Sequence, residues 1–409
     1  MERFIVFVMT PFKSHMFPAF KMAKILKELG IQSIYISSLK MKHEVESRGY
    51  IFYNNLNFNE DGSCMSTSDV AKDIIKKYSP QLFLVETSFW KWALHLKGLK
   101  QHFKMIQTWI CCDRARMLKP LDYRLVTDNS LSAYIQNEDD WVQYNNKQKE
   151  DFDHSDFQLY YKQVLKEANL LEDVIHISKV DRVGYFKVKD VEEIILFPKE
   201  FDVERENYSG VNYIGPFIYE DRDQESIDWS KLNIQNRPIV YCAMGSLTNT
   251  FKNKNIFFKK IISALSEMKD FFLILVSGPD NDELLINRFG ENVYICEFAP
   301  QINILKESSL FITHGGAGSV KESIKFGVPM LVYPWKTKSD MYGNADRLEF
   351  HKIGQLGDIA LDSIQTIKDR IIAVHTDQTI KLNLNKMQNI FLEYEKNEKQ
   401  YLENIIACK

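Results

Sequence analysis

Short apolar runs alternate along this chain with longer segments in which apolar residues recur every three or four positions. The first pair is the apolar run at 4–9 and a segment in which Met22, Ile25 and Leu29 lie on one helical face. A continuous apolar run of this length is typical of a buried parallel strand, and the spacing in the second segment is that of an amphipathic helix. The alternation therefore predicts an open parallel β-sheet covered by helices.

The alternation occurs in both halves of the chain, which are separated by a charged stretch at 220–231 that is typical of a linker. Our predicted fold class is therefore α/β, with two doubly wound (Rossmann-like) parallel-sheet domains that face each other across a cleft. The predicted parts are a domain at 1–218, a linker at 219–236, a domain at 237–386 and a terminal helix at 387–409. We expect strands at 4–9, 34–37, 82–85, 104–107, 239–243, 272–276, 293–296, 310–313 and 330–332, and a helix at 256–268.

A polar and aromatic stretch at 114–163 interrupts the alternation in the first half. Two interpretations of this stretch stay open. Its helices cover the cleft and contact an acceptor molecule, or they form a surface insertion without ligand contact.

The most informative segment runs from 297 to 347. The strand expected at 310–313 is followed by His314, then by Gly315, Gly316 and Gly318, and then by Ser319 at a helix start. Glycines let the backbone approach a ligand closely, and the N-terminus of a helix is a natural seat for phosphate. Glu322 follows one turn later, within reach of ribose hydroxyls. The alternative is a strand–turn–helix unit with ordinary turn glycines.

These residues resemble the donor-sugar signature of family-1 glycosyltransferases. The matching positions are His314-Gly-Gly-x-Gly-Ser-x-x-Glu322, the preceding Phe298-Ala-Pro-Gln301, and the following Gly327-Val-Pro329, Pro334, Asp340 and Asn344-Ala345. The resemblance implies the GT-B fold, with a C-terminal helix that crosses back to the N-terminal domain. It also implies inverting, metal-independent transfer of a hexose from a nucleotide-diphosphate sugar, most simply a UDP-sugar, to a hydroxyl of a lipophilic or aromatic small molecule. No further cofactor is expected.

The same resemblance assigns donor contacts residue by residue. A base would stack on Phe298 and be read by the backbone of Ala299, and the ribose would be held by Gln301 and Glu322. The remaining expected donor contacts are Ser246, His314, Gly316, Gly318 and Ser319 around the diphosphate and Asp340 on the sugar.

Two features of the sugar-binding stretch depart from the family pattern. Many relatives have a glutamine after the aspartate, where this chain has Met341, and two more residues than expected separate Pro334 from Asp340. The departure leaves the sugar undetermined, because a deoxysugar or another hexose would need fewer hydrogen bonds there.

His15 lies in a second segment that resembles the family, just beyond the first strand in the sequence His15-Met-Phe-Pro18. A histidine at that edge of a parallel sheet stands where substrates bind, and its pKa suits a general base. The alternative is a histidine with no role beyond the start of a helix. Glu86, at the end of a later strand, is the expected orienting carboxylate, with Asp113 as the alternative for that role and a helix cap as the alternative role for Glu86.

Composition limits the remaining possibilities. The formal net charge of −3, with both signs interspersed, gives no reason to expect nucleic acid as a partner. No apolar run reaches the length of about 18 residues that a transmembrane helix needs. The six cysteines lack zinc-type pairs, and the D-x-D patterns at 221–223 and 280–282 lie in polar segments, so no metal site is expected. We expect a cytoplasmic protein, monomeric or weakly dimeric.

Two rival functions are consistent with the same fold. One is a nucleotide-sugar epimerase, against which His15 argues because an epimerase has no acceptor hydroxyl to deprotonate. The other is a non-catalytic helper of a partner glycosyltransferase, against which His15 and Asp340 argue together.

Overall fold

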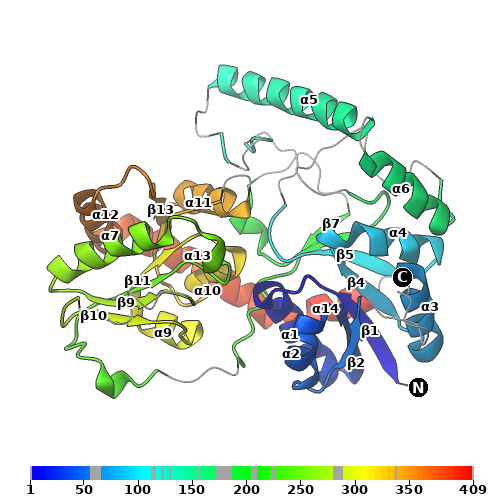
Figure 1. Cartoon of the computed structure of the whole chain (residues 1–409), viewed down its shortest axis with the longest axis horizontal. Coiled ribbons are helices and arrows are strands. Elements are labelled where there is room, and N and C mark those ends of the chain that lie inside the picture. Colours follow the sequence, from blue (N-terminus) through cyan, green and yellow to red (C-terminus); the bar gives the residue numbers. More distant parts are fainter. Residues whose placement is uncertain are drawn as a thin grey trace.

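Two parallel β-sheets with helices packed around them form the computed structural model (Figure 1). It describes residues 2–55, 66–111, 117–120, 124–126, 128, 130–153, 156–171, 187–203, 210–222, 227–279, 289–336 and 339–407. The two sheets lie side by side, and the two C-terminal helices, drawn in red, run across the middle of the molecule from one half to the other. This arrangement confirms the predicted α/β fold class.

The first sheet has seven parallel strands in the order β3-β2-β1-β4-β5-β6-β7. Its strands are β1 (Arg3–Val8), β2 (Ile31–Ser37), β3 (Ile51–Asn54), β4 (Leu82–Glu86), β5 (Phe103–Gln107), β6 (Glu193–Ile195) and β7 (Val211–Tyr213). The helices of this half are α1 (Lys13–Glu28), α2 (Lys42–Glu46), α3 (Thr67–Tyr78), α4 (Trp90–Gly98), α5 (Leu131–Asp153) and α6 (Asp156–Glu167).

The second sheet has six parallel strands in the order β10-β9-β8-β11-β12-β13. Its strands are β8 (Ile239–Ala243), β9 (Phe272–Val276), β10 (Val293–Cys296), β11 (Ser308–Thr313), β12 (Met330–Val332) and β13 (Gly354–Leu356). The helices are α7 (Lys254–Glu267), α9 (Gln301–Glu307), α10 (Ala317–Lys325), α11 (Asp340–Phe350), α12 (Ile364–Thr376), α13 (Gln378–Lys396) and α14 (Glu398–Ala407).

Each sheet reverses its strand order beside its first strand. β1 lies between β2 and β4, and β8 lies between β9 and β11. Loops that leave neighbouring parallel strands in opposite directions open a crevice at their carboxyl ends, which is the usual ligand site in such sheets. The segments after β1, β4, β8 and β11 are therefore placed to form a site.

The strand predictions are confirmed with small shifts, but the sequence missed β3, β6, β7 and β13. Three of these strands are only three residues long, so no apolar period can develop in them. The prediction of one terminal helix from 387 is wrong, because α13 begins at Gln378 and a break at Asn397 separates it from α14.

The two terminal helices join the two halves of the molecule. Leu384, Met387 and Phe391 of α13 pack in the core of the second sheet. Leu402 and Ile405 of α14 pack in the core of the first sheet, against α1. The end of the chain thus crosses from the second half back to the first.

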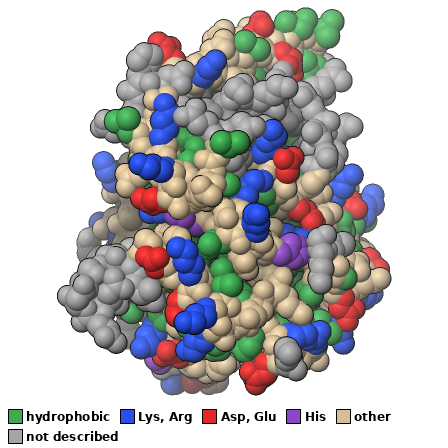
Figure 2. All heavy atoms as spheres, turned by 90° about the vertical axis from the view of Figure 1, so that its right-hand side faces the viewer, with side chains coloured by type: hydrophobic (Ala, Val, Ile, Leu, Met, Phe, Trp, Pro, Cys, Tyr) green, Lys and Arg blue, Asp and Glu red, His purple; other side chains and the backbone are tan. Residues whose placement is uncertain are grey.

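The surface and the helices agree with the composition. On the face shown in Figure 2, Lys and Arg side chains are interspersed with Asp and Glu, and no broad basic area is visible there. Within the part of the chain that the structure describes, no helix combines the length and the apolar character needed to cross a bilayer.

Candidate functional site

A cavity of about 660 Å³ lies between the two halves, at the carboxyl ends of both sheets. Its walls come from segments that follow β1, β5, β8, β11 and β12, and from the linker. All the predicted site residues except Glu86 line this cavity: His15, Ser246, Phe298, Ala299, Gln301, His314, Gly316, Gly318, Ser319, Glu322, Asp340 and Met341.

His15 and Glu86 form a hydrogen-bonded pair at the wall of the first half. β1 and β4 are adjacent strands, so the first turn of α1 and the end of β4 meet at one edge of the sheet. The Nδ1 atom of His15 lies 2.5 Å from Oε1 of Glu86. Glu86 is fully buried and also accepts hydrogen bonds from the backbone N–H of Thr10 and the hydroxyl of Thr108, both at 2.7 Å.

The charges of this pair support each other. Burial disfavours protonation of His15, but the Glu86 carboxylate more than offsets it, and the pKa of His15 is raised above its ordinary value. Burial also disfavours an ionised Glu86, yet His15, Thr10 and Thr108 together hold the pKa of its carboxyl below the ordinary value. An ionised Glu86 fixes the proton on Nδ1, which leaves Nε2 as the nitrogen that can accept a proton from a ligand.

The alternatives for these residues can now be compared with the structure. Glu86 does occupy the position before the short 3₁₀ helix at Thr87–Phe89, but its side chain makes no capping hydrogen bond there. The cap interpretation is therefore wrong, because the carboxylate turns to His15 instead. Asp113 lies outside the described residues.

The glycine-rich turn after β11 brings a helix start to the cavity. α10 begins at Ala317, and its N-cap residue Gly316 has no side chain to cap the helix. The carboxylate of Asp340 accepts a hydrogen bond from the backbone of Ala317 at this helix start. The ring of His314 lies against Gly245 and Gly316, where an added Cβ atom would come within 2.4 Å of the ring. Burial lowers the pKa of His314 to about 4, so this ring is neutral at physiological pH and can donate one hydrogen bond.

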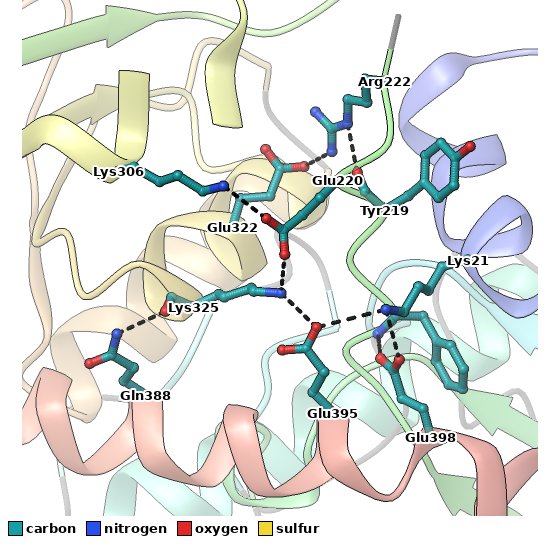
Figure 3. Close-up of polar contacts among 11 residues, drawn as sticks. Lys21, Tyr219, Glu220, Arg222, Lys306, Glu322, Lys325, Gln388, Glu395 and Glu398 are labelled. Atoms are coloured by element: carbon teal, nitrogen blue, oxygen red, sulfur yellow. Dashed lines mark hydrogen bonds and ion pairs between the residues drawn. The ribbon is translucent and has the colours of Figure 1, made fainter. Parts of the chain in front are cut away.

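Glu322 does not stand free in the cavity. Its Oε2 atom accepts a hydrogen bond of 2.6 Å from the amide of Gln301, and its Oε1 atom contacts the guanidinium of Arg222 (Figure 3). Arg222 belongs to the linker, and its guanidinium lies 4.2 Å from the ring centre of Phe17 on α1. Its Nε atom also donates to the carbonyl of Tyr219 at 2.9 Å.

The contact made by Arg222 adjoins a larger group of ion pairs between the linker and the C-terminal helices (Figure 3). Glu220 pairs with Lys306 at 3.1 Å and with Lys325 at 2.6 Å, and Lys325 also reaches Glu395 of α13 at 2.6 Å. Nearly every member comes from a different element, so the network ties the donor-side helix α10 to the linker and to α13. Its further members are Lys21, Gln388 and Glu398.

Asp340 and Met341 begin α11 on the side of the cavity that faces His15. The carboxylate of Asp340 accepts a hydrogen bond of 3.2 Å from Asn344. Burial raises the pKa of Asp340 above its ordinary value, and the nearby His15 counteracts this effect. Both residues line the cavity, and each influences the pKa of the other, so the candidate sugar ligand and the candidate base lie close to the same space.

Of the two D-x-D patterns, for which no metal role is expected, only Asp221 and the residue after it lie within the described residues. Within the described ranges, no group of three or more His, Cys, Asp or Glu side chains is arranged to hold a metal ion. Asp221, from the first D-x-D pattern, pairs with Lys24 on the surface. Asp223, Asp280 and Asp282 lie outside the described residues.

Comparison with known proteins gives the same picture. Residues 245–400 match the model of the glycosyltransferase family 28 C-terminal domain. The chain is 25% identical over 202 residues to NDP-glycosyltransferase YjiC of Bacillus subtilis, and the alignment covers 49% of either chain. It is 26% identical over 145 residues to oleandomycin glycosyltransferase of Streptomyces antibioticus, and that alignment covers 35% of this chain and 33% of the relative. The aligned part thus spans half the length of these curated relatives or less.

Solved structures match over nearly the whole chain. The glycotransferase of kitacinnamycin superposes with a TM-score of 0.76 and 16% identity, covering 99% of this chain and 100% of that one. Glycosyltransferase VinC in complex with dTDP superposes with a TM-score of 0.68 and 13% identity, with coverage of 99% and 100%.

The chain has the GT-B fold, and its sequence is similar to those of bacterial NDP-glycosyltransferases. The structural match covers 99% of the chain, whereas the family model matches residues 245–400. The cleft between the two halves has the start of α10 on one side and the His15–Glu86 pair on the other.

Several residues of the GT-B cleft were not predicted from the sequence. Phe12 and Trp109 flank His15, with ring centres 5.8 and 5.1 Å from the imidazole, and both line the cavity. Thr108 and Arg222 line it as well. Thr108 and Trp109 directly follow β5, so their position after a strand was a usable signal, whereas nothing in the local sequence marks Arg222.

The stretch at 114–163 lies apart from this cleft as far as it is described. α5 forms the outer edge of the molecule in Figure 1, and Leu131 and Ile135 on it are exposed. The buried side of α5 packs through Trp141 onto Leu118 and Leu125. The residues that line the cavity come from other segments.

Proposed function

We propose that this protein is an inverting glycosyltransferase that moves a hexose from a nucleotide-diphosphate sugar, with UDP-sugar as the first candidate donor, to a hydroxyl of a lipophilic or aromatic small molecule. The observation that carries the proposal is the His15–Glu86 pair facing Asp340 and the start of α10 across one cavity. The names of the related NDP-glycosyltransferases support the activity.

The donor would occupy the wall formed by the second half. Phe298 is 71% exposed within the cavity and offers its ring as a stacking surface for a pyrimidine base. Gln301 and Glu322 would bind the ribose, and Ser246, His314 and the backbone of Gly316–Ser319 would bind the diphosphate. VinC was solved with dTDP, so a thymidine nucleotide is the second candidate donor.

The acceptor would occupy the wall formed by the first half, between the aromatic rings of Phe12 and Trp109. Nε2 of His15 would take the proton from the acceptor hydroxyl while Glu86 stabilises the resulting imidazolium. The acceptor oxygen then attacks the anomeric carbon, the bond from that carbon to the diphosphate breaks, and the electron pair leaves with the diphosphate. Attack opposite the leaving group inverts the anomeric configuration. The N-terminus of α10 would stabilise the charge that develops on the diphosphate.

Release of nucleoside diphosphate separates this proposal from its rivals. Purified protein is incubated in EDTA with UDP-glucose or dTDP-glucose, with and without a panel of phenols and lipophilic alcohols. A glycosyltransferase releases the diphosphate mainly when an acceptor is present. Acceptor-independent turnover of the sugar would favour an epimerase, and donor binding without turnover for any acceptor would favour a helper protein.

Glu322→Ala is expected to weaken UDP binding by roughly 1–3 kcal/mol, because it removes a ribose ligand and leaves the partly buried Arg222 without its carboxylate. Titration calorimetry with UDP measures the effect. Glu220→Ala is the matched control, since Glu220 belongs to the ion-pair network that adjoins Glu322 and does not line the cavity. Equal losses in both variants would show that Glu322 acts through the network and not on the nucleotide.

Met341→Gln is expected to raise the use of UDP-glucose relative to nucleotide-deoxysugars. Met341 lines the cavity beside Asp340, and its thioether is a weak acceptor where a glutamine amide could hold a sugar hydroxyl. A competition assay with mixed donors compares the wild type with Met341→Gln, and Met341→Leu is the control for side-chain volume. An unchanged donor ratio in Met341→Gln would show that position 341 does not select the sugar.

A further inference from the structure

The helix that carries the candidate sugar ligand is held by the other half of the molecule. α11 begins with Asp340 and Met341 at the cavity, and its Ala345 and Leu348 pack in the core of the second sheet. Two charged residues of this helix, Asp346 and Arg347, are also buried. Both find their partners in the first half of the chain.

Asp346 is bound by the segment around Arg124. The guanidinium of Arg124 donates to both carboxylate oxygens of Asp346, from NH2 at 2.9 Å and from Nε at 3.1 Å. The backbone N–H of Leu125 donates to the same carboxylate at 2.8 Å. This bidentate contact fixes the orientation of the carboxylate as well as its position.

Arg347 is bound by Asp202, which follows β6 in the first half. Both Nε and NH2 of Arg347 donate to Oδ1 of Asp202, at 3.0 and 2.7 Å. The second oxygen of Asp202 accepts from the hydroxyl of Tyr213 at 2.5 Å, and the side chains of Asp202 and Arg347 are 1% and 3% exposed. One turn later, His351 contacts the carbonyl of Phe201 at 3.0 Å.

The order of charges makes this contact specific for one orientation of α11. Consecutive residues point about 100° apart around a helix, so Asp346 and Arg347 meet two different segments of the first half. A rotation that carried Asp346 toward Asp202 would place like charges together in a buried setting. A buried ion pair adds little net stability compared with apolar contacts, but an arrangement that leaves one of its charges buried without a partner is strongly destabilised. The pairs therefore define where α11 sits.

We infer that Arg124 and Asp202 are positioning residues for sugar transfer: by holding Asp346 and Arg347, they place Asp340 opposite His15. The inference rests on the proposed function. Asp346 follows Asp340 by six positions, which is a rise of about 9 Å along the helix, and a helix this short moves as a rigid piece. Because Asp340 and His15 belong to different halves, their separation depends on contacts between the halves, and these two ion pairs are anchored directly on the helix of Asp340.

The consequence differs from that of a general loss of stability. The nucleotide is expected to bind to Phe298, Gln301 and Glu322, which lie outside α11, so a displaced α11 should leave UDP affinity intact. The additional affinity of UDP-glucose over UDP, and the turnover, should both fall because they depend on Asp340. A misplacement of about 1 Å is enough to lower turnover about a hundredfold.

The variants Arg124→Gln and Asp202→Asn test this inference. Arg124 is 36% exposed, so its variant is the one expected to keep the fold. We expect UDP affinity within about twofold of the wild type, loss of most of the extra affinity for UDP-glucose, and a fall in kcat of about ten- to a hundredfold. Arg124→Lys retains the charge without the bidentate geometry, so its kcat and its affinity for UDP-glucose should lie between those of Arg124→Gln and the wild type.

The matched control is Arg370→Gln, which breaks the ion pair of Arg370 with Asp362 inside the second half. The side chains of Arg370 and Asp362 are 32% and 6% exposed, close to the 36% and 2% of Arg124 and Asp346. Thermal stability, UDP and UDP-glucose affinities and kcat are measured for each variant. Equal effects on kcat in the control, or parallel losses of UDP and UDP-glucose affinity in Arg124→Gln, would overturn the inference. A wild type that binds neither nucleotide would instead refute the proposed function.

Discussion

His15→Ala is expected to lower kcat at least about a hundredfold, the usual scale for loss of a general base. The imidazole has its Nδ1 atom committed to Glu86 and lies on the acceptor side of the cavity, so no other described group replaces Nε2 at that point. Donor affinity should hardly change, because the expected nucleotide contacts belong to the second half. Steady-state kinetics with a saturating acceptor and calorimetry with UDP measure the two effects.

Two controls make the result for His15 interpretable. His15→Gln keeps a polar side chain of similar length without a base in the useful pH range, and it should be as inactive as His15→Ala. His43, a histidine of α2 that does not line the cavity, can be replaced by alanine as a matched control and should leave kcat unchanged. If His15→Ala kept more than about a tenth of wild-type turnover, the assignment of His15 as the base would be wrong.

Glu86→Gln is expected to lower kcat by about a hundredfold or more and to shift the acid limb of the pH–rate profile to lower pH. In the wild type, burial lowers the pKa of His15, but the opposing effect of Glu86 is larger, so the net pKa lies above the ordinary value. The enzyme therefore loses activity as the pH falls through this raised pKa and the imidazole becomes protonated. Without the carboxylate, burial remains and the pKa of His15 falls, so the neutral base persists to lower pH. The rate still drops, because the imidazolium is no longer stabilised and the tautomer is no longer fixed.

The profile of kcat/KM against pH reports the pKa of the free enzyme and is the decisive measurement for Glu86. Glu86→Asp keeps the charge on a side chain one methylene shorter, so it should retain part of the rate and an acid limb near that of the wild type. A Glu86→Gln enzyme with a reduced rate but an unshifted acid limb would show that Glu86 supports the fold around Thr10 and Thr108 and does not tune His15.

Local patterns in the sequence were sufficient for the overall architecture. Long apolar runs such as those of β8 and β9 can be recognised because a strand buried on both faces needs apolar residues at every position. The turn from His314 to Ser319 can be recognised because close packing of the His314 ring on Gly316 forbids a side chain there. Such requirements act between residues close in sequence, so they leave a readable pattern.

Features with weak local patterns were missed or misplaced. β6, β7 and β13 are short strands whose positions depend on pairing with β5, β6 and β12 respectively, not on their own residues. The helix break at Asn397 lies in a segment of uniform helical character, and only the passage from one core to the other decides it. Tertiary contacts, not propensity, determine these boundaries.

The sequence by itself determined the α/β fold with two parallel sheets, because the apolar spacing along strands and helices is local. The family resemblance supplied most of the residues expected at the cleft, but not Phe12, Thr108, Trp109 or Arg222. Only the tertiary structure decided which residues act together: it joined Glu86, the expected orienting carboxylate, to His15, and it revealed the pairs of Arg222 with Glu322 and of Asp202 with Arg347. The physical reason is that each pair joins elements far apart in the chain, 71, 100 and 145 residues respectively. Charges at such separations carry no periodic signal, and their partners are settled only when the sheets, the linker and the terminal helices have packed.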